Sequence, residues 1–245
     1  MPIGVTSAIS LSIPAVAGTA STTITSASLS GPPAGSLVVV FASDTGGAGD
    51  GSYSFAGPSP STGWTTILQL ADNEAVGDQT YVGAYYVTGS FPNTFFTGAL
   101  GLNITAVVLT GAAGPVVIDG DIGTTHAFVA PAFATTSTIT TAINNSMLLA
   151  FFSANLVSGR SWSATPPTGT FLAARSTSAT SVAPAAALYY LDRGTNTGVV
   201  NSLTANLSVT GGSTTTILLA IKEFTSGGGG PAIIIVPKIG WGILL

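Results

Sequence analysis

The chain has 245 residues, of which 6% are charged and 46% hydrophobic, and its net charge is −4. Because it contains no cysteine, disulfides, thiolate metal sites and thiol nucleophiles are excluded. Five Lys and Arg residues against nine acids form no basic patch, so no nucleic-acid partner is expected.

The first 27 residues are predicted to form an N-terminal arm or a first strand. Their alternating Ser and Thr residues permit strand pairing. The segment lacks the basic start of a secretory signal, and no uncharged apolar run in the chain reaches the ~20 residues that span a bilayer. We therefore expect a protein that is made in the cytoplasm and does not cross a membrane.

Residues 28–225 are predicted to form an all-β, antiparallel sandwich. Short apolar runs recur between clusters of Gly, Pro, Asn and Ser, a pattern typical of a sandwich or barrel. Residues 37–41 and 147–152 are apolar throughout, which predicts central strands that are covered on both faces or lie at a subunit contact. The clearest predicted strands begin at Ser36, Trp64, Thr80, Ile104, Ser146, Ala186, Leu203 and Thr214.

The sequence also repeats itself once. GSLVVVFASD at Gly35 matches NSMLLAFFSA, GAYYV at Gly83 matches ALYYL, and ITAVVLTG at Ile104 matches TTILLAIK, at offsets of 110, 104 and 111 residues. The resulting half-units, 35–118 and 145–224, fit either one sandwich with pseudo-symmetric halves or two small sandwiches. No low-complexity linker separates them, so we expect one body.

The order of these segments resembles jelly-roll β-sandwich proteins found among the structural proteins of tailed bacteriophages. GSLVVVF, a proline-rich turn into GWTTIL, TYVGAYYVTG and ITAVVLTGAAGPVVID follow one another as GDLLL, PPAGWT, YRVA and YRGV…PID segments do in that family. The resemblance covers Ser28 to Phe224; it departs in LTGAAGPVVID, where an Arg-containing segment is common. It implies a non-enzymatic head-decoration, fibre or tail protein of a virion, assembled as a homo-oligomer, by analogy a trimer, with other virion proteins.

Candidate catalytic and metal-binding residues lie in polar, glycine-rich segments. His126 is the only histidine, and GTTHAFVAP contains no nucleophile elbow, so we expect a polar loop residue there. Acids such as Asp44 and Asp50 favour turn formation over a glycosidase carboxylate pair. A structural Ca²⁺ would take oxygen ligands from such loops, although no EF-hand is complete. The Ca²⁺ candidates are Asp72, Glu74, Asp78, Asp119 and Asp121.

Aromatic residues near the proline-rich turns indicate an alternative function, a carbohydrate-binding module for a host-surface glycan. Tyr53 and Trp162 lie in polar loops, where an exposed ring would stack on a sugar, whereas Trp64 opens an apolar strand and is expected in the core. Three sequons are interpreted as coincidences of a chain rich in Asn, Ser and Thr; they start at Asn103, Asn144 and Asn206.

The C-terminal residues 226–245 combine a glycine hinge with an apolar segment. An exposed apolar strand tends to pair with other chains, and Pro231, Pro237 and Lys238 interrupt any membrane span. We expect this tail to dock between subunits, with docking on its own sandwich as the alternative. The predicted docking residues are Ile233, Ile234, Ile235, Val236, Ile239, Trp241, Ile243, Leu244 and Leu245.

Overall fold

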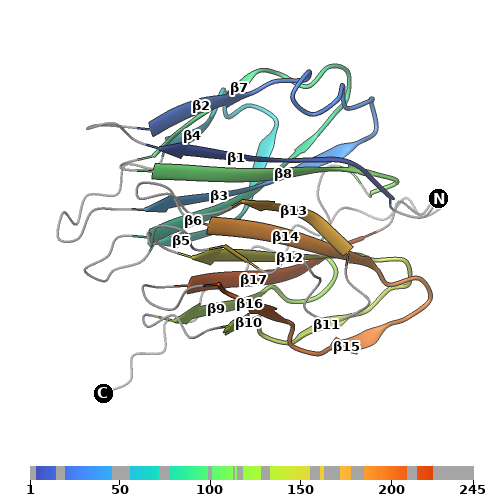
Figure 1. Cartoon of the computed structure of the whole chain (residues 1–245). Coiled ribbons are helices and arrows are strands. Elements are labelled where there is room, and N and C mark those ends of the chain that lie inside the picture. The colour runs from blue at the N-terminus through green and yellow to red at the C-terminus, as the bar shows by residue number, and fades with distance from the viewer. Residues whose placement is uncertain are drawn as a thin grey trace.

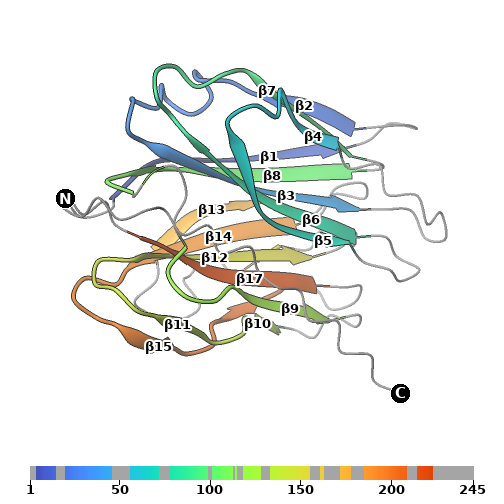
Figure 2. The ribbon, with the colours of Figure 1, turned by 180° about the vertical axis from the view of Figure 1, so that it is seen from behind.

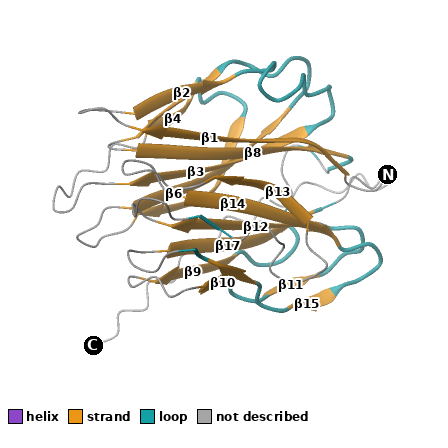
Figure 3. Cartoon of the chain, in the orientation of Figure 1, coloured by secondary structure: helices purple, strands orange, loops and turns teal. Residues whose placement is uncertain are grey.

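The computed structural model is an antiparallel β-protein. It describes residues 4–14, 20–45, 56–71, 78–98, 101–112, 114, 118–127, 133–154, 161–162, 172–177, 185–208 and 214–222. Every regular element in these ranges is a β-strand (Figure 3). The predicted all-β, antiparallel class is confirmed. Within the same ranges no helix is long and apolar enough to cross a membrane.

The first half of the chain forms a five-stranded sheet with a smaller sheet on its outer side. Its strands are β1 (Gly4–Pro14), β2 (Ala20–Ile24), β3 (Leu37–Thr45), β4 (Ala56–Ser59), β5 (Trp64–Ala71), β6 (Asp78–Tyr86), β7 (Thr94–Gly98) and β8 (Gly101–Thr110). The large sheet has the order β1-β8-β3-β6-β5, and the outer sheet has the order β2-β7-β4. Strands β1 and β2 therefore lie in the N-terminal range 1–27.

The second half has a five-stranded sheet and two small outer sheets. Its strands are β9 (Gly123–Ala127), β10 (Phe133–Thr135), β11 (Ile139–Thr141), β12 (Met147–Ala154), β13 (Leu172–Thr177), β14 (Ala185–Asp192), β15 (Gly198–Val200), β16 (Thr204–Asn206) and β17 (Thr214–Ile221). The large sheet has the order β13-β14-β12-β17-β9, and the outer pairs are β10-β16 and β11-β15. Figures 1 and 2 show the outer sheets at the top and bottom of the molecule, with the large sheets between them.

Three apolar cores separate these layers. The central core lies between the two large sheets, the first outer core lies under β2-β7-β4, and the second outer core lies under the small sheets of the second half. The body thus has four layers rather than the two of a single sandwich.

The strands that are apolar throughout are explained by this layering. On β3, Leu37, Val39 and Phe41 point into the central core, whereas Val38 and Val40 point into the first outer core. Strand β12 alternates in the same way between the central and second outer cores. The prediction of central strands that are covered on both faces is confirmed, but both covering layers belong to the same chain. These strands consequently carry no argument for a subunit contact.

The two ends of the molecule differ in their connections. Turns 25–36, 87–93, 142–146 and 193–197 join strands at one end, which we name the turn end, and backbone hydrogen bonds hold them. At the other end, which we name the loop end, β3, β5 and β12 lead into ranges outside the described residues. Strands β3 and β12, the middle strands of the two large sheets, run in the same direction, and both end at the loop end (Figure 1).

Candidate functional site

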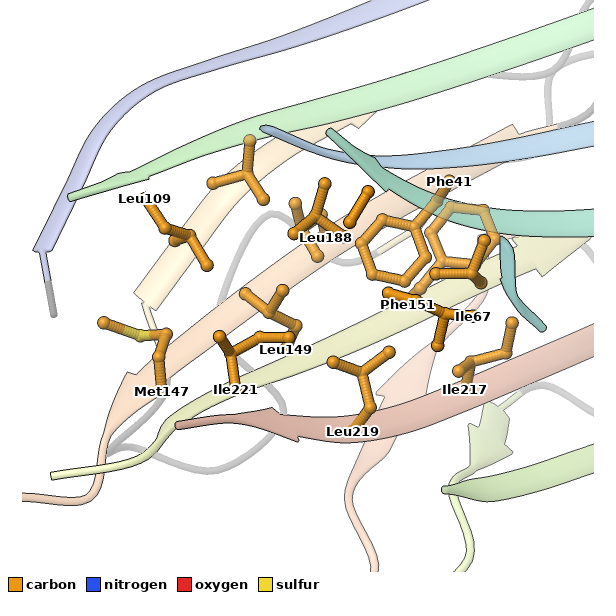
Figure 4. Packing of buried hydrophobic residues seen from close by; sticks show 14 of the residues in the cluster. Phe41, Ile67, Leu109, Met147, Leu149, Phe151, Leu188, Ile217, Leu219 and Ile221 are labelled. Atoms are coloured by element: carbon orange, nitrogen blue, oxygen red, sulfur yellow. The ribbon is translucent and has the colours of Figure 1, made fainter. Parts of the chain in front are cut away.

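The two large sheets meet face to face at β3 and β12. The rings of Phe41 and Phe151 stack with centroids 4.8 Å apart and planes 19° from parallel, and Figure 4 shows them facing one another between the two sheets. One pleat nearer the loop end, the hydroxyl oxygens of Ser43 and Ser153 lie 2.6 Å apart in a buried hydrogen bond. The central core therefore changes from apolar to polar along these strands.

The polar part of the core forms a row across both sheets, which we name the polar row. Ser43 is paired in its ladders with Thr80 and Asn103, and Ser153 is paired with Thr215 and Ala186. The five polar members, Ser43, Thr80, Asn103, Ser153 and Thr215, are all buried. Buried hydroxyl and amide groups normally need hydrogen-bond partners. The row thus places buried hydroxyl and amide groups between the apolar core and the loop end, with the Ser43–Ser153 hydrogen bond joining the two sheets.

His126 stands at the end of the polar row, because its backbone pairs with Thr215 in the β9–β17 ladder. The expectation of a loop residue was wrong, since His126 belongs to strand β9. Beyond the row, Asp44 pairs with Gln79 and Asp78 pairs with Thr45. Two of the chain's acids therefore sit on neighbouring strands at the loop end. Sequence reasoning missed this arrangement, although serine interrupts both apolar strands at matching places of the repeat.

The Ca²⁺ candidates divide into two groups. Asp72, Glu74 and the side chain of Asp78 lie outside the described part, so a site there stays a prediction. Among the described residues, no group of three or more His, Asp or Glu side chains is placed to hold a metal ion. Asp121 is exposed at the turn end.

Asp119 has a structural role that its carboxylate geometry defines. It is fully buried, and its oxygens accept hydrogen bonds from the Ala142 N–H at 2.9 Å, the Ile143 N–H at 3.2 Å and the Ser146 hydroxyl at 2.5 Å. Its own N–H donates to the Ala220 carbonyl. These bonds hold turn 142–146 against β17, so turn formation rather than metal binding accounts for this carboxylate.

Of the three tryptophans, Trp162 lies in a core, Trp64 packs against one, and Trp241 lies outside the described residues. Trp162 is 3% exposed, its ring centroid lies 5.3 Å from that of Phe152, and its indole N–H donates to the Ala185 carbonyl at 3.3 Å. It therefore offers no exposed face to a sugar, because a bridge to Leu207 draws its polar segment onto the second outer core. Trp64 packs against the first outer core as expected. Tyr53 lies outside the described residues.

The described surface is nearly uncharged and rich in hydroxyl groups. Among the side chains that the structure describes, the exposed charged residues are Asp121 and Asp192. The exposed large apolar residues in the same set are Phe95 (43%), Phe133 (50%) and Val199 (64%), on outer strands β7, β10 and β15. Sequon residue Asn103 is buried in the polar row, whereas Asn144 and Asn206 are exposed.

Comparisons of the chain with protein-family models, with curated proteins and with solved structures find no match. The order of the strands, the packing of the cores and the chemistry of the surface are therefore the observations from which a function is argued.

Proposed function

We propose that the protein is a non-enzymatic structural component of a tailed-phage virion, in a head-decoration, fibre or tail position, built from two jelly-roll units. The observation that carries this proposal is the nested pairing of strands. In the first half the first strand pairs with the last and the pairing continues inward, so that β1 pairs with β8, β2 with β7 and β3 with β6. In the second half β9, β10, β11 and β12 pair with β17, β16, β15 and β14. This nested winding supports a jelly roll, an architecture of viral capsid and lectin domains.

The two units are copies of one another in this proposal. Read from β9, the second large sheet has the order β9-β17-β12-β14-β13, which matches β1-β8-β3-β6-β5 strand for strand. The edge strands β5 and β13 also carry a register shift at the same place, opposite Gly83 and Val82 in one unit and Tyr189 and Leu188 in the other. A shared irregularity of this kind supports duplication, because bulges are retained within families.

Sister copies and other virion proteins are the proposed partners, and the C-terminal residues 226–245 are the proposed link to them. This tail lies outside the described residues, so its docking residues stay a prediction. The described surface, on which the exposed charged side chains are Asp121 and Asp192, supports close assembly, since packing such faces together buries few charges.

The assembly proposal is tested by truncating the chain before Gly227. We expect a smaller oligomer by light scattering and loss of incorporation into particles seen by electron microscopy. A matched control replaces residues 231–245 by a Gly/Ser segment of equal length, which keeps the chain length and removes the apolar anchors; it should behave like the truncation. An unchanged oligomer and unchanged incorporation in both variants would contradict the proposal.

A carbohydrate-binding role is the second candidate, and Phe95 is the observation that favours it. Phe95 lies on the central strand of an outer sheet, directly between Thr23 and Ser59, and all three are exposed. An aromatic face flanked by hydroxyls suits a neutral sugar ring. Glycan-array binding that is lost in Phe95→Ala but retained in Val199→Ala, a control on the other outer face, would favour this role; no binding by the intact chain would exclude it.

A further inference from the structure

We infer that the inner face of each unit is a self-complementary surface, so that the central core is an internal twofold interface and the partner that fits this face is a second copy of the same unit. The inference rests on the duplication in the proposed function. It concerns how the units meet rather than where the protein assembles.

Residues that meet their own counterparts mark the axis of a twofold interface. Strand β3 begins at Leu37 and its counterpart β12 begins at Met147, an offset of 110 residues. Phe41 stacks on Phe151 and Ser43 bonds to Ser153, and both pairs have this offset. Two successive inward positions of β3 therefore touch their own equivalents, which places the axis between the two strands.

The lateral order of the strands gives the direction of the axis. Strand β8 contacts β14 across the core and β1 contacts β13, whereas the reciprocal contacts of β6 with β17 and of β5 with β9 are weaker, so the twofold is approximate. Units stacked by simple translation would instead bring β8 to its counterpart β17. A rotation about an axis along the strands reverses the order of the second sheet and keeps β3 and β12 running in the same direction, as observed.

The polar row shows the same symmetry. In the first sheet Asn103, Ser43 and Thr80 follow one another, and in the second sheet Ala186, Ser153 and Thr215 do so. Because β8 contacts β14, the twofold arrangement predicts that Asn103 lies opposite Ala186 and, reciprocally, that Thr80 lies opposite Thr215. One consequence is that both units turn their loop ends to the same side. The loop end is thus a composite face to which each unit contributes equivalent strand ends.

Cysteine pairs in the full-length chain test the inference, because the natural chain contains no cysteine. The twofold arrangement predicts disulfides in Ser43→Cys/Ser153→Cys, in Asn103→Cys/Ala186→Cys and in Thr80→Cys/Thr215→Cys. The controls combine the same four substitutions away from the axis in the other way, as Thr80→Cys/Ala186→Cys and Asn103→Cys/Thr215→Cys. They should give about tenfold less disulfide by mass spectrometry, since Cys residues whose Cα atoms are more than about 7 Å apart do not bridge.

Disulfides in the recombined pairs and not in the first three would overturn the twofold arrangement. Self-complementarity is tested by a chain in which residues 4–112 also replace 118–222, and by the reciprocal chain with 118–222 in both positions. At least one should fold as a monomer with a single cooperative unfolding transition; failure of both would overturn the inference. Neither measurement uses a particle, so their outcome is independent of the virion-assembly tests.

Discussion

The two halves of the molecule share the order of their large sheets but differ at their edges and outer layers. In the first half β1 pairs with β8 over its whole length, from Gly4 to Pro14. In the second half the equivalent strand β9 has five residues, and the bridge between Ile118 and Ile221 stands apart from it. Asp119 occupies this interruption. A buried carboxylate thus anchors the turn end of the second half beside an edge strand shorter than its counterpart.

The two halves also differ in the contacts of the serine that precedes each central strand. Ser146 precedes β12 and donates to Asp119. Ser36 precedes β3 and is also fully buried, but its hydroxyl has no hydrogen-bond partner in the described structure. Large apolar faces therefore hold the common architecture, while single polar contacts distinguish one half from the other. Substitutions at equivalent positions test this division.

Substitution of the central phenylalanines should have the largest effect. Phe41→Ala and Phe151→Ala each leave a cavity between the two large sheets, and each should lower the free energy of unfolding by about 3 to 5 kcal/mol. Because the two rings contact one another, the double variant should lose less than the sum of the single losses. Denaturant unfolding measures all three. Strongly unequal single losses would show that the halves do not share this interface equally.

Asp119→Ala should have the next largest effect. It leaves the N–H groups of Ala142 and Ile143 and the Ser146 hydroxyl without their acceptor, and each such loss costs about 1 to 3 kcal/mol when the group stays buried. We expect a total loss of about 3 kcal/mol, in the range of a large single-residue effect. Asp121→Ala, at an exposed neighbouring carboxylate, is the matched control and should change stability by less than about 0.5 kcal/mol. Equal effects would contradict the anchoring role.

High pH should destabilise the second outer core through Tyr189. Burial raises the pKa of Tyr189 to about 12 from its ordinary value of 10.0. The unfolded chain therefore loses this proton first, so the stabilising contribution is complete below pH 10 and is lost as the pH rises to about 12. Tyr189→Phe should reduce the fall in stability over this interval, measured by denaturant unfolding at successive pH values. A pH profile identical to that of the natural chain would contradict the assignment.

The sequence predicts the large sheets better than the layers that cover them. Apolar runs at 37–41 and 147–152 are long enough to identify β3 and β12, and their lack of alternation correctly indicates cover on both faces. The outer strands β10, β11, β15 and β16 have three residues each, so they are too short to carry a periodic signal. For the same reason, the sequence could not show that the chain covers its own apolar strands.

Two of the three offsets that the sequence predicts for the repeat are wrong. Leu37 pairs with Leu109 and Met147 pairs with Ile221, an offset of 112 rather than 111 residues. Leu37 also pairs with Tyr86 and Met147 with Asp192, an offset of 106 rather than 104 residues. A slip of one residue moves every side chain to the other face of the sheet. Strand β17 is apolar on both faces, so its sequence contains no alternation that would detect the slip. The burial of Trp162 could not be predicted for a related reason. Its neighbours in the sequence are polar and indicate an exposed loop, whereas its burial results from a β-bridge to Leu207, which is distant in the sequence.

The smallest expected effect compares the two serines directly. Ser146→Ala removes a hydrogen bond to a buried carboxylate and should cost about 1 to 2 kcal/mol. Ser36→Ala removes a buried hydroxyl that has no partner in the described structure, so the change should be neutral or stabilising by up to about 1 kcal/mol. Thermal unfolding of both variants measures whether the two substitutions change stability in opposite directions. If Ser36→Ala destabilised the chain as much as Ser146→Ala, an acceptor for Ser36 would have to exist, and the local contrast between the halves would disappear.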